Sequence, residues 1–354
     1  MTKWTNNEHM KTTNKFTNTP VIFLGIDVGK AELFCHLILA NSSHSEKFRN
    51  TPTGIINLIK WLSIHADLNQ ILACMEHTGI YGKLVSKALF DAKVGGVFLV
   101  NPRRIKAYGN QKLRRNKSDT ADAKLIANFL KSEYDDLLFW SPQSPDCEQI
   151  TELSRHADSI TKDTARLKTK CESISSKAIL RSIKRTIKFL EKEIADIRKR
   201  INDLIKKNKD LVAMKSLLAS IPGIGEITQQ ILIAELPDIN LFKNARQLAA
   251  WAGLTPQHFE SGTSGRTQTP ITKIGSSILR KALFMPAMTA RTNNPLLKEF
   301  GDRLQKNGKK PKQIIIAIMR KLLHQIYGIL KSNQPFNPNK KGFIIAKNPE
   351  EICA

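Results

Sequence analysis

Four acidic residues in the N-terminal part of the chain stand where a fold can bring carboxylates together. Asp27 ends an apolar, strand-like run in GIDVGK, and Glu76 ends another in LACMEHTG. Asp119 and Asp122 are three residues apart in KSDTADAK, a spacing that places both on one face of a helix. An ionised side chain at the end of an apolar strand needs a cation or hydrogen-bond donors. These acids are therefore candidates for metal ligands.

Gathered at one place, four carboxylates repel one another unless divalent cations hold them. Oxygen ligands suit Mg²⁺ or Mn²⁺. Two such ions about 4 Å apart activate a nucleophile and stabilise the leaving oxygen in phosphodiester displacement. Singly, each acid has a simpler interpretation, since a strand-end Asp is often a turn residue and acids are favourable in a helix's first turn. The set is more specific than its members and predicts metal-dependent nucleic-acid chemistry.

The segment from Pro20 to about Pro145 must position these acids, and it alternates strand-like and helix-like runs. Strands are predicted in VIFLGIDVG, AELFCHLILA, ILACMEHTG and GGVFLVNP, the first two as a β-hairpin. Helices are predicted in TGIINLIKWLSIH, YGKLVSKALFDAK and SDTADAKLIANFLKS, the last with Ser118 as its N-cap. This alternation predicts an α/β layered domain over residues 20–145. The polar residues 1–19 are expected to be a disordered lead-in.

The middle of the chain, from Asp146 to Ile221, contains no Gly and no Pro. Apolar residues recur there in alternating steps of three and four: Leu180, Ile183, Ile187, Leu190, Ile194, Ile197, Ile201 and Leu204. This heptad seam predicts a long coiled-coil helix within residues 146–220, with Asn208 on the continued register. The seam needs a partner helix. An antiparallel hairpin within the chain and a homodimer are both open, and we favour the dimer.

After Pro222, Gly and Pro again punctuate the sequence. Helical runs are predicted at about 225–236, 243–252, 275–291 and 311–331, so the second domain, residues 221–332, is expected to be mainly α-helical. Residues 333–354 are expected to form a loose tail.

The charge of the chain indicates its partner. Lys and Arg number 56 against 31 Asp and Glu, a net charge of +25. Such a field attracts polyanions, which favours a nucleic-acid partner over a merely basic surface. The sequence has no run of roughly 20 apolar residues, so no membrane span is predicted. The five cysteines are scattered, without the spacing of zinc ligands, and fit a reducing cytoplasm.

The order of GIDVGK, MEHTG and KSDTADAKLIA resembles the DEDD transposases and site-specific recombinases of the insertion-sequence 110 type, including the Piv-like DNA invertases. IPGIGEITQQILIAEL, WAGLTPQHFESGTSG, ITKIGSSILRKAL and NPLLKEFGDRLQKNGKKPKQIIIAIMRKLLHQIYGIL resemble that family's C-terminal transposase domain. The resemblance runs from about Val21 to Lys331.

This resemblance implies an RNase H-like, RuvC-type fold for the first domain, with the metal ligands Asp27, Glu76, Asp119 and Asp122. It implies a catalytic serine in the C-terminal domain, which forms a covalent link to cut DNA. It further implies a structured non-coding bridge RNA that pairs with donor and target DNA. Assembly into homodimers and homotetramers with composite active sites is also implied.

Ser261, in QHFESGTSG, fits the serine of that motif best. A Gly-rich loop would let its hydroxyl approach the scissile phosphate closely, with metal or a nearby base to activate it. Ser264 also precedes a glycine and is its main rival. From the bare sequence, a serine in a Ser/Gly/Thr loop is usually an ordinary loop residue, and the resemblance alone favours Ser261 as a nucleophile.

Several further residues are candidates for nucleic-acid binding. Gly223 and Gly225, in the PGIG turn of a helix-hairpin-helix-like segment, would present amides to a backbone phosphate; a plain helical corner is the alternative. Basic side chains beside the acidic helix and near the serine would bind phosphates, or would be solvated faces: Arg103, Arg104, Lys106, Arg114, Arg115, Lys273 and Arg280.

The sequence thus predicts a cytoplasmic, nucleoid-associated bacterial recombinase with a carboxylate–metal site and a serine nucleophile. Two other functions stay open. One is a metal-dependent nuclease of the Holliday-junction-resolvase kind, in which the C-terminal half only binds DNA. The other is a non-enzymatic nucleic-acid-binding protein.

Overall fold

The computed structural model describes residues 22–77, 79, 81–111, 119–256 and 270–339. These residues form two compact units, which meet in the chain between Pro142 and Gln143. This division falls three residues before the predicted end of the α/β domain. Each unit is described by itself. The predicted lead-in, residues 1–19, lies outside the described residues.

The first unit is built on a five-stranded mixed sheet with the order β3-β2-β1-β4-β5. β2 runs antiparallel to β1 and β3, whereas β1, β4 and β5 are parallel. This order confirms the α/β, RNase H-like fold and the predicted β1–β2 hairpin. The strands are β1 (Ile22–Val28), β2 (Glu32–Ile38), β3 (Ser43–Arg49), β4 (Ile71–Glu76) and β5 (Gly96–Val100). β3 escaped prediction because its sequence, SHSEKFR, is polar and mostly exposed.

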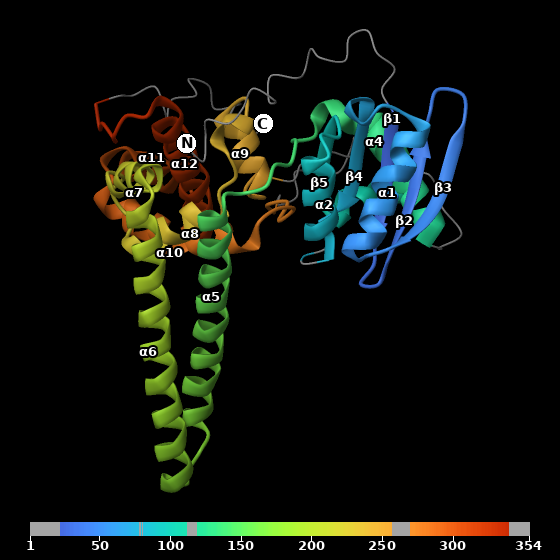
Figure 1. The fold of residues 1–354 in the computed structure, drawn as a ribbon. Coiled ribbons are helices and arrows are strands. Elements are labelled where there is room, and N and C mark those ends of the chain that lie inside the picture. Colours follow the sequence, from blue (N-terminus) through green and yellow to red (C-terminus); the bar gives the residue numbers. More distant parts are fainter. Residues whose placement is uncertain (1–21, 78, 80, 112–118, 257–269, 340–354) are drawn as a thin grey trace. The chain divides into compact units, whose positions relative to one another are not determined.

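Helices cover both faces of this sheet (Figure 1). Alternate residues of β1 point to opposite faces, so Leu24 and Ile26 join the core under α1 and α2, while Phe23 joins the core under α3 and α4. The helices are α1 (Pro52–His65), α2 (Tyr81–Asp91), α3 (Pro102–Gln111) and α4 (Asp119–Glu133), with short 3₁₀ turns η1 (Leu68–Gln70) and η2 (Tyr134–Asp136). α3 was not predicted, because its basic residues were interpreted as a connection.

The backbone of α4 lies directly on β1 at Gly25. A Cβ atom built on Gly25 would stand 2.2 Å from the carbonyl oxygen of Ala123 and 2.3 Å from the amide nitrogen of Ala127. Both alanines are fully buried. Only a glycine on the strand and small residues on the helix permit this approach, which therefore fixes where α4 begins relative to the end of β1.

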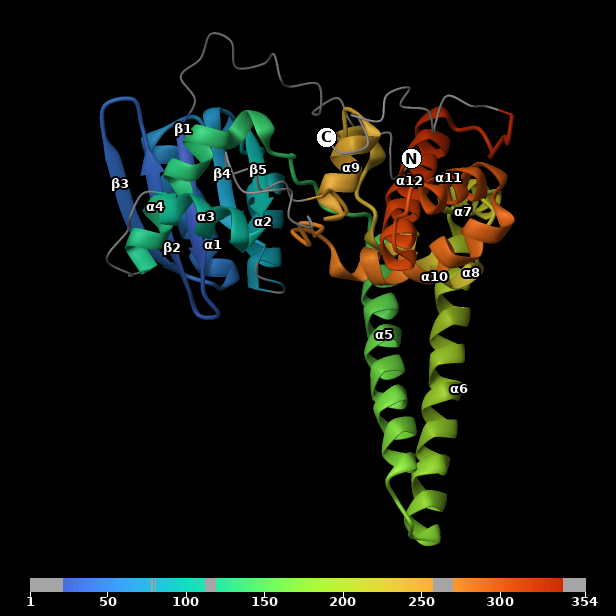
Figure 2. The ribbon, with the colours of Figure 1, turned by 180° about the vertical axis from the view of Figure 1, so that it is seen from behind.

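The second unit starts with a pair of long helices, α5 (Pro145–Glu172) and α6 (Lys177–Lys207), which run antiparallel to each other (Figures 1 and 2). α5 is the helix against which α6 packs, so the seam finds a partner within the chain. Along α6, Ile194, Ile197 and Ile201 are buried, whereas the seam residues nearer the hairpin tip are half-buried.

The predicted seam lies on one long helix, α6, which covers only part of residues 146–220. The chain reverses at residues 173–176 and breaks again at Asn208. Asn208 does not serve as a polar seam residue, because its side-chain oxygen accepts hydrogen bonds from the amides of Asp210 and Leu211 and so caps the next helix. An Asn that bonds to nearby backbone amides favours a helix start over a helix interior. That the hairpin is a heptad coiled coil stays a prediction.

The rest of the second unit is mainly α-helical, as predicted: α7 (Lys209–Ala219), α8 (Glu226–Glu235), η3 (Ile239–Leu241), α9 (Ala245–Trp251), α10 (Ser277–Asn293), α11 (Pro295–Lys306) and α12 (Pro311–Ser332). By length and composition α12 could cross a membrane. It packs instead against α7, α9, α10 and α11 and buries residues such as Ile318, Leu322 and Ile326, as a core helix does.

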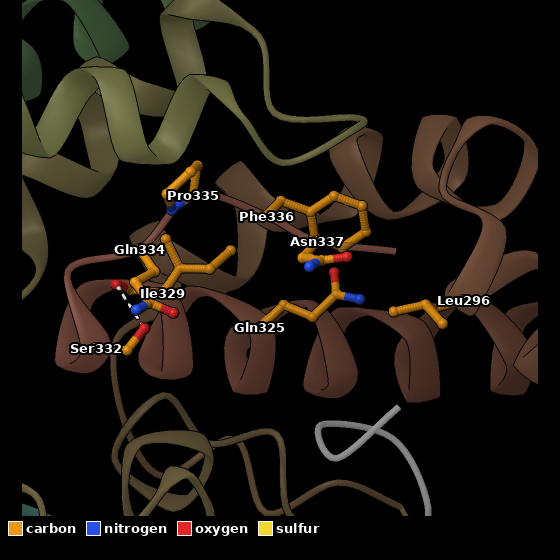
Figure 3. Close-up of a pocket in the computed structure, with 8 residues that line it drawn as sticks. All are labelled: Leu296, Gln325, Ile329, Ser332, Gln334, Pro335, Phe336 and Asn337. Atoms are coloured by element: carbon orange, nitrogen blue, oxygen red, sulfur yellow. Dashed lines mark hydrogen bonds between the residues drawn. The ribbon is translucent and has the colours of Figure 1, made fainter. Parts of the chain in front are cut away.

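The start of the predicted tail is not loose. The amide of Phe336 donates to Ser220 Oγ at 2.9 Å. Pro335 and Phe336 lie over Gln325 and Ile329 of α12, around a small, largely apolar pocket (Figure 3). The described part of the tail, up to Asn339, therefore belongs to the second unit.

The contact of α4 with β1 generates a stability prediction. Gly25→Ala should lower the free energy of unfolding by about 2 kcal/mol or more, because the added methyl group meets backbone atoms that cannot rotate away. Urea unfolding followed by circular dichroism measures this change. Gly82→Ala in α2 is the matched control, since the nearest atom to its Cβ would be Met75 Sδ at 3.9 Å. It should leave stability unchanged or raise it by up to about 1 kcal/mol; equal losses in both variants would contradict the contact.

Candidate metal centre

Three of the four predicted carboxylates come together in the first unit. Carboxylate oxygens of Asp27, Asp119 and Asp122 all lie within 4.8 Å of one another. Asp27 is the last residue but one of β1, and the other two acids stand in the first turn of α4. Asp27 and Asp122 are half-buried, and Asp119 is exposed. The group is thus anchored on the sheet and open to solvent on one side.

The approach of α4 to Gly25 explains this grouping. Asp27 lies two residues beyond Gly25, so both face the side of the sheet that α4 covers. Asp119 and Asp122 precede Ala123, the first α4 residue in contact with Gly25. The first turn of α4 therefore comes to lie over the end of β1, where Asp27 stands.

Glu76 stands at the end of the neighbouring strand and is not part of the group of three. In the parallel β1–β4 pair, Ile26 lies opposite Met75. Asp27 and Glu76 are the next residues of their strands, so they stand at the same level of the sheet. Glu76 shares the α4 face, because Leu72 and Cys74 of the same strand belong to the core under α3 and α4. The structure thus places Glu76 beside the group, on the correct face of the sheet.

The electrostatics around β4 also involve a predicted basic residue. Burial raises the pKa of the Cys74 thiol far above its usual range; the Glu76 carboxylate adds to this rise and the Arg104 guanidinium opposes it. Arg104 lies on α3, 3.7 Å from a carboxylate oxygen of Glu133 and over the ring of Phe129. It is thus held near the strand that carries Glu76.

Two of the other basic candidates near the acidic group lie on α3. Arg103 and Lys106 are exposed on α3, whereas Arg114 and Arg115 lie outside the described residues. Exposed cations on a helix next to the acidic group could contact a phosphate backbone. They are equally consistent with a helix face that is simply solvated.

The donor set fits a hard divalent cation. All its ligand atoms are carboxylate oxygens, which Mg²⁺ and Mn²⁺ prefer. Oxygens bound to one Mg²⁺ at about 2.1 Å lie up to about 4 Å apart, close to the spread of the three acids. Their summed negative charge also needs compensation at such short separations.

Ser261 and its rival Ser264 lie in residues 257–269, outside the described residues. The flanks of this segment come together: Pro256 and Ile271 form an antiparallel bridge, and the amide of Thr272 donates to the carbonyl of Thr255 at 2.9 Å. The segment that carries both serines therefore leaves and rejoins the helical unit at one place. Lys273 follows this bridge, with a left-handed backbone (φ 52°).

The predicted glycine hairpin is the turn between α7 and α8. Gly223 has φ 102°, and a Cβ atom there would stand 2.8–2.9 Å from atoms of Ala290 and Pro286 in α10. The packing of α10 therefore accounts for Gly223. Gly225, which precedes α8, would have nothing within 4 Å of its Cβ. Arg280 donates to the carbonyl of Ala252 at 2.9 Å and so joins α10 to the end of α9.

Sequence reasoning missed the residues that position the acids. The apolar run VIFLGIDVG predicts a strand but gives Gly25 no role of its own. The pair Ala123 and Ala127, four residues apart on the same helix, was not connected with it. A glycine in a strand combined with small residues at helical spacing is the signal that marks such a close approach.

Two family models match the chain. One is described as "Transposase IS116/IS110/IS902 family" and matches residues 215–302. The other, described as "Transposase", is the model of the DEDD transposases of IS110 and matches residues 24–177. The first model covers much of the helical part, and the second covers the sheet with its acidic group.

Individual proteins are also similar to this chain, two of them over most of its length. The pilin gene-inverting proteins of Moraxella lacunata and Moraxella bovis are each 33% identical over 318 residues, which is 89% of this chain and 97% of theirs. An uncharacterized 43.6 kDa protein of insertion element IS110 from Streptomyces coelicolor is 28% identical over 118 residues, 33% of this chain and 29% of that protein. Among solved structures, Thermus thermophilus RuvC bound to a Holliday junction matches with 16% identity and a TM-score of 0.27, over 34% of this chain and 99% of that one.

The spacing of the acids generates a prediction that needs no metal. In buffer with a chelator, Asp27→Asn should raise the free energy of unfolding by about 1 kcal/mol, because two charge repulsions at close range disappear. Asp67→Asn is the control: Asp67 is exposed in the same unit and makes no side-chain cap bond. It should change stability by no more than about 0.5 kcal/mol. A marked loss of stability in Asp27→Asn would show that its carboxylate accepts stabilising hydrogen bonds rather than suffering repulsion.

Proposed function

The chain belongs to the IS110 family of transposases and DNA invertases, and on this premise we propose that it recombines DNA with a two-part site. One part is a divalent-metal centre, Mg²⁺ or Mn²⁺, held by Asp27, Glu76, Asp119 and Asp122. The other is a serine nucleophile, Ser261. The observation that carries the proposal is the convergence of three carboxylates within 4.8 Å where the first turn of α4 covers the end of β1.

Each described residue has a defined task in this proposal. A bound divalent cation would neutralise charge on the scissile phosphate and make an attacking oxygen a better nucleophile. Asp27 and Glu76, fixed on adjacent strands, hold one side of the centre, and Asp119 and Asp122 close it from α4. Arg103, Arg104 and Lys106 would bind the phosphate backbone beside the centre.

The serine step conserves phosphodiester bonds. Ser261 Oγ attacks phosphorus, loses its proton to a base or water, and forms a phosphoserine ester while the deoxyribose oxygen leaves and takes up a proton. Attack by the hydroxyl of a second strand reverses these events: a new phosphodiester forms and the serine hydroxyl is restored. No oxidant, reductant or nucleotide is consumed.

The partners follow from the family. DNA is the substrate, as expected for a transposase or invertase. A structured bridge RNA would select donor and target DNA, and a homodimer or homotetramer would assemble composite sites in the cytoplasm, at the nucleoid. The net charge of +25 supports binding to both nucleic acids.

A metal-only, resolvase-like nuclease is the second candidate. The observation in its favour is that the carboxylate group forms within the first unit alone. The two candidates differ in whether a protein–DNA covalent link forms.

The metal half is tested by conservative substitutions. Asp122→Asn and Glu76→Gln should each reduce Mg²⁺-dependent strand cleavage by more than about 100-fold. Mutating a residue that only hydrogen-bonds to a metal ligand already lowers metal affinity or activity by about 10–100-fold. Cleavage of a labelled DNA carrying the element end, with RNA copurified from the host, measures this. Asp67→Asn should cleave normally. Normal cleavage by both site variants would contradict the metal centre.

The serine half is tested by comparing alanine variants of the two serines, Ser261 and Ser264. Ser261→Ala should abolish both recombination and the covalent protein–DNA adduct seen on denaturing gels, because no other hydroxyl would take its place. Ser264→Ala should keep both. The reverse result assigns the nucleophile to Ser264. Full recombination by both variants would exclude both serines as the nucleophile and leave the metal centre to carry the chemistry alone.

A further inference from the structure

One face of α12 carries a row of polar side chains inside the helical unit. Arg320, His324, Tyr327 and Lys331 follow one another at steps of four, three and four residues, which places them on one side of the helix. The Tyr327 hydroxyl donates to the carbonyl of Phe242 at 3.1 Å, and Lys331 Nζ donates to Asn240 Oδ1 at 2.8 Å. This face therefore points at the segment formed by η3 and α9, which packs against α12 (Figure 1).

The other half of the row has buried donors without partners. Arg320 Nε and His324 Nε2 are inaccessible to solvent and have no hydrogen-bond partner among the described residues. A buried donor left unpaired has lost its hydrogen bonds to water without replacement, and the cost is higher when the group is charged. Buried polar atoms without partners are rare in folded proteins, so these two, four residues apart on α12 and followed by a third in Gln325 Nε2, call for an explanation.

The charged groups that shift the pKa of this pair, among the residues that the structure describes, are cations. Burial, together with the charge of Arg246 on α9, lowers the pKa of Arg320. Burial, followed by the charges of Lys321, Arg320 and Arg246, lowers the pKa of His324 to about 4. Arg246 is exposed, and Arg320 and His324 are half-buried as whole residues. Solvent thus reaches the edge of a cluster of cations that α9 and α12 hold together.

We propose that Arg246, Arg320 and His324 form a binding site for one backbone phosphate of a nucleic acid. A phosphodiester offers two anionic oxygens, which match the fork of an arginine and accept from an imidazole N–H. Bound beside the exposed Arg246, it would offset the repulsion between the two arginines, and a turn of the Arg320 and His324 side chains toward it would give Arg320 Nε and His324 Nε2 their missing partners. The inference rests on the proposed function only in taking the ligand to be nucleic acid. The phosphate could come from DNA or from the guide RNA.

The test measures binding without chemistry. Full-length protein is titrated in EDTA, at several salt concentrations, with labelled duplex DNA of the element end and with RNA that copurifies. Arg320→Gln should weaken binding of at least one polymer by about tenfold and lower the slope of log K against log salt by about one. The polymer affected identifies the source of the phosphate. Lys312→Gln, which removes an exposed charge from the same helix, should change affinity less than about twofold.

Stability separates a binding role from a structural one. Without nucleic acid, the Tm of Arg320→Gln should stay the same or rise, because a half-buried cation with one buried, unpaired donor has been removed. Arg320→Lys should keep the salt slope but bind more weakly, since it keeps the charge and loses the fork. Unchanged affinity and slope for both polymers, or a lower Tm in Arg320→Gln, would overturn the proposal. Because the titration is carried out in EDTA, it does not depend on the metal centre, so failure of that centre would be seen separately in the cleavage assay.

Discussion

The candidate site depends on one steric constraint, the contact between the backbone of α4 and Gly25 of β1. A helix on a sheet normally stands off by the thickness of two side chains. Here the separation is so small that a single methyl group on Gly25 would overlap main-chain atoms of Ala123 and Ala127. The contact leaves the first turn of α4 over the end of β1, so the positions of Asp119 and Asp122 relative to Asp27 follow from packing. The acids themselves repel, and the apolar core under α4 must hold them.

Much of the first unit is predictable because its elements have strong local signals. Apolar runs identify β1, β2, β4 and β5, and helical spacing identifies α1, α2 and α4. β3 lacks such a signal because it is an edge strand whose residues are mostly solvated. The acids could be identified as candidate metal ligands from their positions at the ends of strands and the start of a helix. Their grouping could not be worked out from spacing alone, because it depends on a contact between residues about 100 positions apart, between Gly25 and Ala123.

In the helical unit, less of the arrangement can be predicted from the sequence. Its helices are predictable, but their connections and partners are not. The seam of α6 has the same pattern whether its partner comes from the same chain or another, and only the reversal at residues 173–176 decides that α5 packs there. The polar face of α12 was likewise invisible in the sequence, because Arg320 and His324 gain meaning only from α9, which lies more than 70 residues earlier in the chain. Long-range packing, rather than local propensity, sets what these residues can bind.

The central claim is that the carboxylates at the start of α4 and the end of β1 hold a divalent cation. Anomalous diffraction from crystals soaked in Mn²⁺ tests it most directly, because the signal locates the ion without reference to activity. The account predicts an anomalous peak among the oxygens of Asp27, Asp119 and Asp122, with Glu76 at its edge and no peak there in Asp122→Asn crystals. Crystals that bind Mn²⁺ elsewhere on the chain and leave these oxygens without a peak would contradict it.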